Sequence, residues 1–411
     1  MIQNAFQSIK DDFQRSLFYW LTFVLTTIFM FVFFQIACSP SIGMTFIDSH
    51  NSIVTTLSVF VIFICLLSVF FANDFYVKKK SKELAIQLVC GATFRQLTVF
   101  LLSQTVILFC LAIPIAFLLS YLLLSLLPLT ITFSQEGMNV TLSMMAFEVF
   151  WCTILNLGYA YRSSIVMLIQ GDRASLKQPL SLPFHFSKQM KKGLILVMFV
   201  GPIVLLYIYG KETSSTILFS MIGMIGLYQF LGQIIIPDMD QWIQQKLDSY
   251  LSLVYLGFLR RDIIFMKNHI VFQIASDVLM IGLFVMGIDN ALYMILIYVS
   301  FLATHCLLSL TILFRFSTEM IEREKLVVTL KRIGYENDAL KKILRKEIIL
   351  LYGMILLLGL FYLFNILLSL YLHGLMDFMI LVVMILTFMI PLMLCAIINH
   401  YQYQKQMNID S

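Results

Sequence analysis

Long uncharged apolar runs alternate with short polar segments along the whole chain. A run of about 20 apolar residues can cross a hydrocarbon core of about 30 Å as a single helix. Such runs predict ten membrane-spanning helices, at residues 17–38, 52–73, 97–127, 142–161, 193–210, 214–236, 268–286, 290–314, 346–372 and 376–400. The pattern therefore predicts an all-α integral membrane protein.

Composition and charge support this assignment. Apolar residues make up 60% of the chain and charged residues 12%, which excludes an ordinary soluble domain. If the amino terminus is cytoplasmic, 27 of the 28 Lys and Arg residues fall in inner segments and only Lys211 lies outside. We therefore expect both termini on the cytoplasmic side. The formal charge of +5 reflects this distribution more than an anionic partner.

Two amphipathic segments precede predicted spans. Residues 1–16 carry Ile2, Phe6, Ile9 and Phe13 at helical spacing, which is typical of a helix lying in the membrane interface. A cleaved signal peptide is the alternative for residues 1–38, but the amino end has no net positive charge and the apolar run is longer than a signal core. A matching apolar stripe before span seven predicts a second interfacial helix, with Trp242, Ile243, Leu247, Tyr250, Leu251, Val254 and Phe258.

A short charged segment occurs twice, each time between the second and third span of a four-span set. Residues 75–104 and 320–347 can be laid over each other without a gap. Three pairs then coincide: Lys82 with Lys325, Gly91 with Gly334, and Leu97 with Leu340. Each copy predicts a helix that ends at a left-handed Gly, followed at once by a second helix. In the first copy Thr93 and Gln96 predict a capping box, and in the second Asn337 or Asp338 is expected to cap.

The repeat sets the predicted domain organisation. Spans one to four form a first repeat and spans seven to ten a second, and the two spans between them give both repeats the same orientation. Span three, at about 31 residues, is expected to be about 45 Å long with a kink at Pro114. The predicted parts are 1–165 (first repeat, coupling segment 75–97), 166–192 (cytoplasmic linker), 193–236 (two linking spans), 237–267 (interfacial segment) and 268–411 (second repeat, coupling segment 316–346).

The charged run followed by E-L-A-I-Q-L-V-C-G-A-T-F-R-Q-L resembles the cytoplasmic coupling segment of FtsX-like permeases of ABC transporters. Ten spans arranged as four, two and four resemble the BceB-type branch of that family, whose members act in antimicrobial-peptide resistance and sensing. The resemblance implies that these segments dock onto separate cytoplasmic ATPase subunits, two per permease, and relay their ATP-driven motion outward. The coupling contacts it implies are Lys78, Lys79, Lys80, Lys82, Glu83, Gly91, Thr93 and Arg95 in the first copy, and Arg323, Glu324, Lys325, Gly334, Lys341 and Lys342 in the second.

The chain also departs from the BceB-type pattern. Those permeases carry a large extracellular domain between spans seven and eight, where this chain has only the four residues 287–290. The other outer segments, 39–51 and 128–141, are short. We therefore expect a lipid-like or membrane-inserted peptide substrate. Membrane lipids are further expected partners, as are an additional membrane subunit or a sensor kinase.

The chain shows no chemistry of its own that would make it an enzyme. It has no Gly-x-x-x-x-Gly-Lys-Ser/Thr loop, so we expect ATP and Mg²⁺ on a partner subunit and no cofactor on this chain. Its six His residues lack metal-ligand spacing, and its seven Cys residues predict packing and not a disulfide framework. Nucleic-acid binding has no support, because the basic residues are not interleaved with aromatic ones.

Three ionisable residues fall inside predicted spans: Glu148, Asp277 and His305. Such residues rarely face lipid, so they are candidates for an intramembrane substrate path or a proton relay, with inward packing as the alternative. Asn156 and Asn365 are expected to form interhelical hydrogen bonds. Three functions stay open from the sequence: an ABC transporter permease, an FtsX-type mechanotransmitting regulator that moves no substrate, and an ion-coupled transporter that uses the intramembrane carboxylates.

Overall fold

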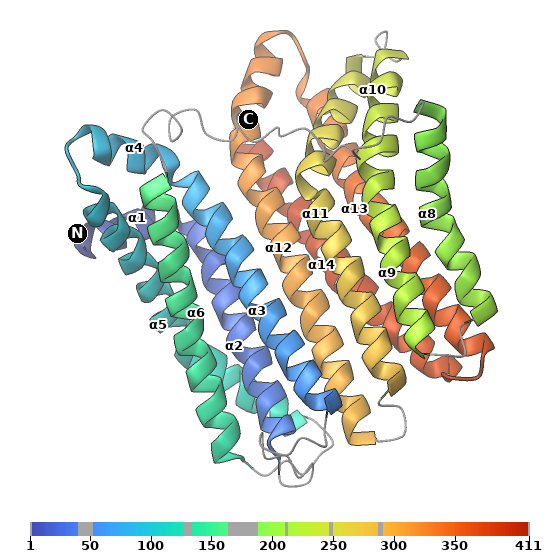
Figure 1. Cartoon of the computed structure of the whole chain (residues 1–411). Helices are drawn as coiled ribbons and strands as arrows, with labels where there is room; N and C mark the ends of the chain where they lie inside the picture. Colours follow the sequence, from blue (N-terminus) through green and yellow to red (C-terminus); the bar gives the residue numbers. More distant parts are fainter. Residues whose placement is uncertain are drawn as a thin grey trace. The chain divides into compact units, whose positions relative to one another are not determined.

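A computed structural model describes residues 2–39, 52–126, 133–162, 188–209, 213–245, 250–286 and 291–409. In these ranges every secondary-structure element is a helix. Ten of the helical segments are long and apolar enough to cross a membrane, and each overlaps one of the ten predicted spans. The predicted all-α, multi-span membrane architecture is therefore confirmed (Figure 1).

The first repeat contains two short helices and four long ones. The short ones are α1 (Ile2–Asp11) and α4 (Ser81–Val89). The long ones are α2 (Phe13–Ala37), α3 (Ser52–Lys79), α5 (Phe94–Leu126) and α6 (Gln135–Arg162). With 33 residues, α5 is the long third span that the sequence predicts, and Pro114 lies inside it.

The second repeat has four long helices: α11 (Tyr250–Met286), α12 (Ala291–Arg332), α13 (Asn337–Leu372) and α14 (Phe378–Ile409). The starts of its last two helices follow those of the first repeat at an interval of 243 positions. That interval separates Gly91 from Gly334, the first residue of α5 from that of α13, and the first residue of α6 from that of α14. The gapless alignment of the two coupling segments therefore extends to the starts of the two spans that follow each segment.

The linking region differs from its prediction. It contains α8 (Lys188–Tyr209) and α9 (Thr213–Phe230), and α9 continues through a π-helical turn, η2 (Leu231–Ile235), into α10 (Ile236–Gln245). The interfacial segment predicted over 237–267 falls on α10, which prolongs span six, and on the first part of α11 from residue 250, and its interfacial position stays a prediction. The apolar stripe that predicted it is shared between two helices. The predicted linker 166–192 and the turn 287–290 lie almost entirely outside the described residues.

By contact the chain divides into two compact units that cut across the repeats. Unit 1 holds Met1–Lys177 with Ala291–Thr318, and unit 2 holds Gln178–Asn290 with Glu319–Ser411. The membrane part of α12 therefore belongs with the first four spans. Its Phe314 ring lies 5.9 Å from that of Phe18 on α2 and 6.1 Å from that of Phe75 on α3.

Candidate functional site

The two coupling segments contain the same backbone turn. In the first, α4 ends and Gly91 takes a φ of 92°. The Gly91 N–H donates to Leu88 O at 3.0 Å, and the Ala92 N–H donates to Gln87 O at 2.9 Å. These two bonds make a Schellman motif, which satisfies carbonyls at the helix end and favours Gly because a Cβ is strained at positive φ.

The second turn repeats this arrangement at equivalent positions. Gly334 has a φ of 110°, its N–H donates to Lys331 O at 3.0 Å, and the Tyr335 N–H donates to Leu330 O at 3.1 Å. No side chain or backbone atom lies within 4 Å of a Cβ built at Gly91 or Gly334. Both turns therefore require glycine for its backbone conformation and not for lack of space. The predicted helix, Gly turn and helix are confirmed in both copies.

The capping of the next helix differs between the copies. In the first, the Thr93 N–H donates to Gln96 Oε1 at 2.9 Å and the Gln96 N–H donates to Thr93 Oγ1 at 3.3 Å, which confirms the predicted capping box. In the second, the N-cap residue is Glu336, and its side chain makes no capping hydrogen bond. The prediction that Asn337 or Asp338 caps is wrong, because both residues already lie within the first turn of α13.

The surface around the first turn is mainly apolar. Ile86 is 64% exposed, Val89 70% and Phe94 43%, and the neighbouring Arg95 is also exposed. We call these four residues the first turn surface. Large aliphatic side chains at such exposure on an otherwise polar connection are typical of a contact surface for another molecule.

The second turn surface is charged. It comprises Arg332, Ile333, Glu336, Asp338, Lys341 and Lys342, all exposed, so three basic and two acidic side chains surround Ile333, which is 70% exposed. Exposed charges continue along α13 to Lys346, which corresponds to Ser103 on α5, whereas the last charge on α5 is Arg95. The last exposed charge on α13 thus lies eight positions beyond the position that corresponds to Arg95. Eight helical residues span about 12 Å at about 1.5 Å per residue. The second turn therefore projects about 12 Å farther beyond its apolar stretch than the first turn does.

The predicted coupling residues of the first copy do not all lie at the surface. Lys78 is partly exposed and pairs with Asp74 at 2.7 Å, one helical turn earlier. Lys80 is 2% exposed, so its charge faces inward. The side chains of Lys79 and Lys82 lie outside the described part of the structure, as do those of Arg323, Glu324 and Lys325 on α12.

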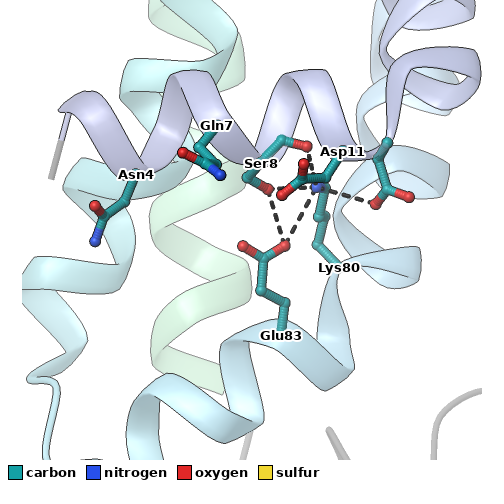
Figure 2. A pocket seen from close by; sticks show the side chains of 7 residues that line it. Asn4, Gln7, Ser8, Asp11, Lys80 and Glu83 are labelled. Carbon is teal, nitrogen blue, oxygen red and sulfur yellow. Dashed lines mark hydrogen bonds and ion pairs between the residues drawn. The ribbon is translucent and has the colours of Figure 1, made fainter.

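Lys80 lies at the break between α3 and α4, and its ammonium group is directed at α1. Its Nζ lies 2.5 Å from Ser8 Oγ, 3.1 Å from Asp12 Oδ2 and 3.2 Å from Glu83 Oε2. The Ser8 hydroxyl also donates to Glu83 Oε2 at 3.0 Å. Figure 2 shows this cluster between α1 and the start of α4, at a groove of about 330 Å³ lined by Asn4, Gln7, Ser8, Asp11, Asp12, Lys80 and Glu83.

The three intramembrane candidates are all buried. Glu148 on α6 and His305 on α12 belong to unit 1, and Asp277 on α11 belongs to unit 2. Neither carboxylate oxygen of Glu148 has a hydrogen-bond partner among the described residues. Its equivalent in the second repeat is Pro391, inside α14, so the fold of the repeat does not require an acid there. The path-lining role stays a prediction for all three.

A buried hydrogen-bonded chain connects the four spans of the first repeat. The Tyr19 hydroxyl donates to Asn73 Oδ1 at 2.8 Å, Asn73 Nδ2 donates to Asn156 Oδ1 at 3.0 Å, and Asn156 Nδ2 donates to Thr105 Oγ1 at 3.2 Å. These residues lie on α2, α3, α6 and α5 respectively. The predicted interhelical role of Asn156 is confirmed, and so is that of Asn365, which accepts a 2.9 Å hydrogen bond from Tyr207 of α8.

The second repeat keeps only part of this chain. At the interval of 243, Asn156 corresponds to Asn399, Cys152 to Cys395 and Gln104 to Glu347, and all six are buried, whereas Asn73 and Thr105 correspond to the apolar Phe316 and Ile348. Asn399 Nδ2 donates instead to the Tyr352 hydroxyl of α13. This junction was not predicted. Extending the alignment of the charged segments across the spans would have revealed it.

The cysteines only partly match their prediction. No disulfide forms, and Cys38, Cys65, Cys152 and Cys395 are buried as packing residues. Cys90 and Cys110 are exposed, contrary to expectation. Within the described residues no group of His, Cys, Asp and Glu could hold a metal ion.

Comparison with known families gives one match. Residues 55–171 match the family model of the FtsX-like permease C-terminal domain. Over this part of the first repeat the chain is similar to FtsX-like permeases. The match begins in α3 and covers α4, α5 and α6, so it includes the whole first coupling segment. A comparison with curated proteins found no match.

Proposed function

We propose that this protein is an FtsX-like permease, the transmembrane subunit of an ABC transporter, and that both of its coupling segments bind a cytoplasmic ATPase. The observation that carries the proposal is the pair of identical Schellman turns at Gly91 and Gly334. Topology alone requires only charge in these connections. Two exposed turns of the same geometry, each joined to a long helix that crosses the membrane, are suited to transmit motion from a protein bound at the turn.

FtsX-like permeases usually work with an ABC ATPase, which supports the choice of partner. The chain has no phosphate-binding loop, so the nucleotide and Mg²⁺ would be held by the ATPase and this subunit would not itself be an enzyme. We place the protein in a bacterial cell membrane with both termini and both turns on the cytoplasmic side, as the distribution of Lys and Arg indicates.

The substrate we propose is an amphipathic peptide or a lipid-like molecule, exported or extracted for immunity to antimicrobial peptides. The ten-span, BceB-type arrangement and the short outer segments support this choice. A regulator that moves no substrate is the alternative, and substrate stimulation of ATP hydrolysis would separate the two. The burial of Glu148 inside a span favours ion-coupled transport as a third function, which proton-dependent transport without any ATPase would support.

The test is purification of the tagged permease from its own membranes in mild detergent, with identification of bound proteins by mass spectrometry. Wild type is compared with a Gly91→Val, Gly334→Val double variant, because valine is strongly disfavoured at positive φ. The matched control is Gly158→Val with Gly353→Val, since both glycines lie in helices with free space around the Cβ position.

We expect an ATPase to copurify with wild type and with the control, and to be lost from the Gly91, Gly334 variant while that variant stays folded. An ATPase that binds all three forms equally would contradict the role of the turns. The absence of an ATPase from all three would contradict the transporter assignment.

A further inference from the structure

The ion cluster at Lys80 joins two elements that are distant in the sequence. Lys80 follows the last residue of α3, and its partners Ser8 and Asp12 belong to α1 and to the bend that follows it. A second hydrogen bond from Nζ reaches the Ser8 carbonyl at 3.2 Å, and the ring of Tyr76 lies 5.8 Å from Nζ. The ammonium group therefore has acceptors from both α1 and α4, as Figure 2 shows.

Burial makes this cluster sensitive to the loss of Lys80. A buried ammonium is tolerated only when it is paired and hydrogen-bonded. Removing Lys80 leaves the carboxylates of Asp12 and Glu83 without the cation between them, whereas removing one carboxylate leaves Lys80 paired with the other. Asp12 is also 3.4 Å from Arg15, and Asp11 lines the same groove. The positive charge of Lys80 thus lies between the carboxylates of Asp12 and Glu83, which would repel each other without it.

Exposed apolar side chains lie on α1 and at the start of α2. On α1 itself Phe6 is 59% exposed, and on α2 Phe13 is 64% and Leu17 41% exposed. Apolar side chains on a short amphipathic helix next to a membrane span are typical of a helix in the bilayer interface. We therefore expect α1 to face lipid with Phe6 while Ser8 faces the first coupling segment.

The second coupling segment does not repeat the residues of this cluster. At the interval of 243, Lys80 corresponds to Arg323 and Glu83 to Leu326, so the carboxylate of Glu83 has no equivalent. In addition, α12 continues as one helix through the position where α3 and α4 are broken. The backbone break that places Lys80 toward α1 therefore occurs in the first coupling segment and not at the equivalent position of α12.

We propose that Lys80 is a positioning residue that fastens the first coupling helix, α4, to the interfacial helix α1. The two helices then move as one body, anchored in the membrane interface, when a partner acts on the first turn surface. This inference rests on the proposed function for what the motion does, but the attachment itself can be tested on the permease alone.

The test combines hydrogen exchange with ATP hydrolysis. Lys80→Met removes the charge and keeps the length of the side chain, and Asp12→Asn weakens the same cluster from α1. Lys78→Met is the matched control, because Lys78 makes only an exposed pair with Asp74 within α3. Amide exchange is measured by mass spectrometry over α1 and α4 in the full-length protein.

We expect Lys80→Met to increase the amide exchange rates of α1 and α4 together by roughly tenfold or more. Asp12→Asn should increase the same rates by a smaller factor. Lys78→Met should leave the exchange rates of both helices unchanged. Unchanged exchange in both cluster variants would overturn the attachment. With the ATPase present, we expect Lys80→Met to keep the subunit bound but to lose the permease's effect on hydrolysis. Normal coupling despite faster exchange would overturn the positioning role, whereas a failure to bind any ATPase would count against the proposed function instead.

Discussion

The two coupling segments have the same backbone turn but expose different side chains around it. Both end a helix in a Schellman turn at a glycine, 243 positions apart. The first presents an apolar surface close to its membrane span, is capped by Thr93 and is attached to α1 through Lys80. The second presents basic and acidic residues about 12 Å farther from its apolar stretch and continues an unbroken α12. The backbone turn is therefore repeated in both copies, whereas the side chains around it differ between the copies.

The largest effect is expected from the buried junction of the first repeat. Asn73→Leu removes the link between Tyr19 and Asn156, which leaves Asn156 Oδ1 without its donor and Tyr19 with only a 3.8 Å hydrogen bond to Cys152 Sγ. We expect a loss of about 1–3 kcal/mol of stability, or nearer 1 kcal/mol if the unfolded helices find partners in the membrane. Thermal unfolding in detergent measures it, with Ser143→Ala as control, because Ser143 is exposed and bonds only within its own helix. No change in melting temperature would show that the junction does not stabilise the repeat.

Salt should separate the two turn surfaces. Gly91→Val leaves the charged second surface to bind the ATPase, and Gly334→Val leaves the apolar first surface. Raising the salt concentration from ~0.1 M to ~1 M shortens the Debye length from about 10 Å to about 3 Å. We expect the Gly91→Val form to lose ATPase binding several-fold over this range and the Gly334→Val form to lose little. Equal salt dependence would mean that the difference in surface charge does not matter for binding.

The smallest effect should come from the helix caps. Thr93→Ala removes the capping hydroxyl, and we expect it to destabilise the start of α5 by about 1 kcal/mol. Glu336→Thr gives the second copy the residue of the first and should stabilise the start of α13 by a similar or smaller amount. Amide exchange over the first turn of each helix measures both changes. Opposite signs are expected, and a stabilising effect of Thr93→Ala would contradict the capping box.

Periodicity and glycine chemistry account for what the sequence predicted. The ten spans, both Gly turns and the Thr93 capping box follow from local patterns, because membrane burial and positive φ leave few alternatives. The apolar stripe at 237–267 did not predict that α10 continues span six, because a stripe does not show where one helix ends and the next begins. The burial of Lys80 could not be predicted, since its partners lie some 70 positions earlier and only the packing of α1 brings them near. A run of lysines predicts a cytoplasmic surface, but it does not show which lysine side chain is buried.

The most direct test of the central claim is the native mass of the purified complex. Two separate turn surfaces predict two ATPase subunits on the wild-type permease, one on Gly91→Val, one on Gly334→Val and none on the double variant. The Gly158→Val, Gly353→Val control should keep both. A wild-type complex with a single ATPase subunit that survives either glycine substitution would contradict the claim that each coupling segment binds its own subunit.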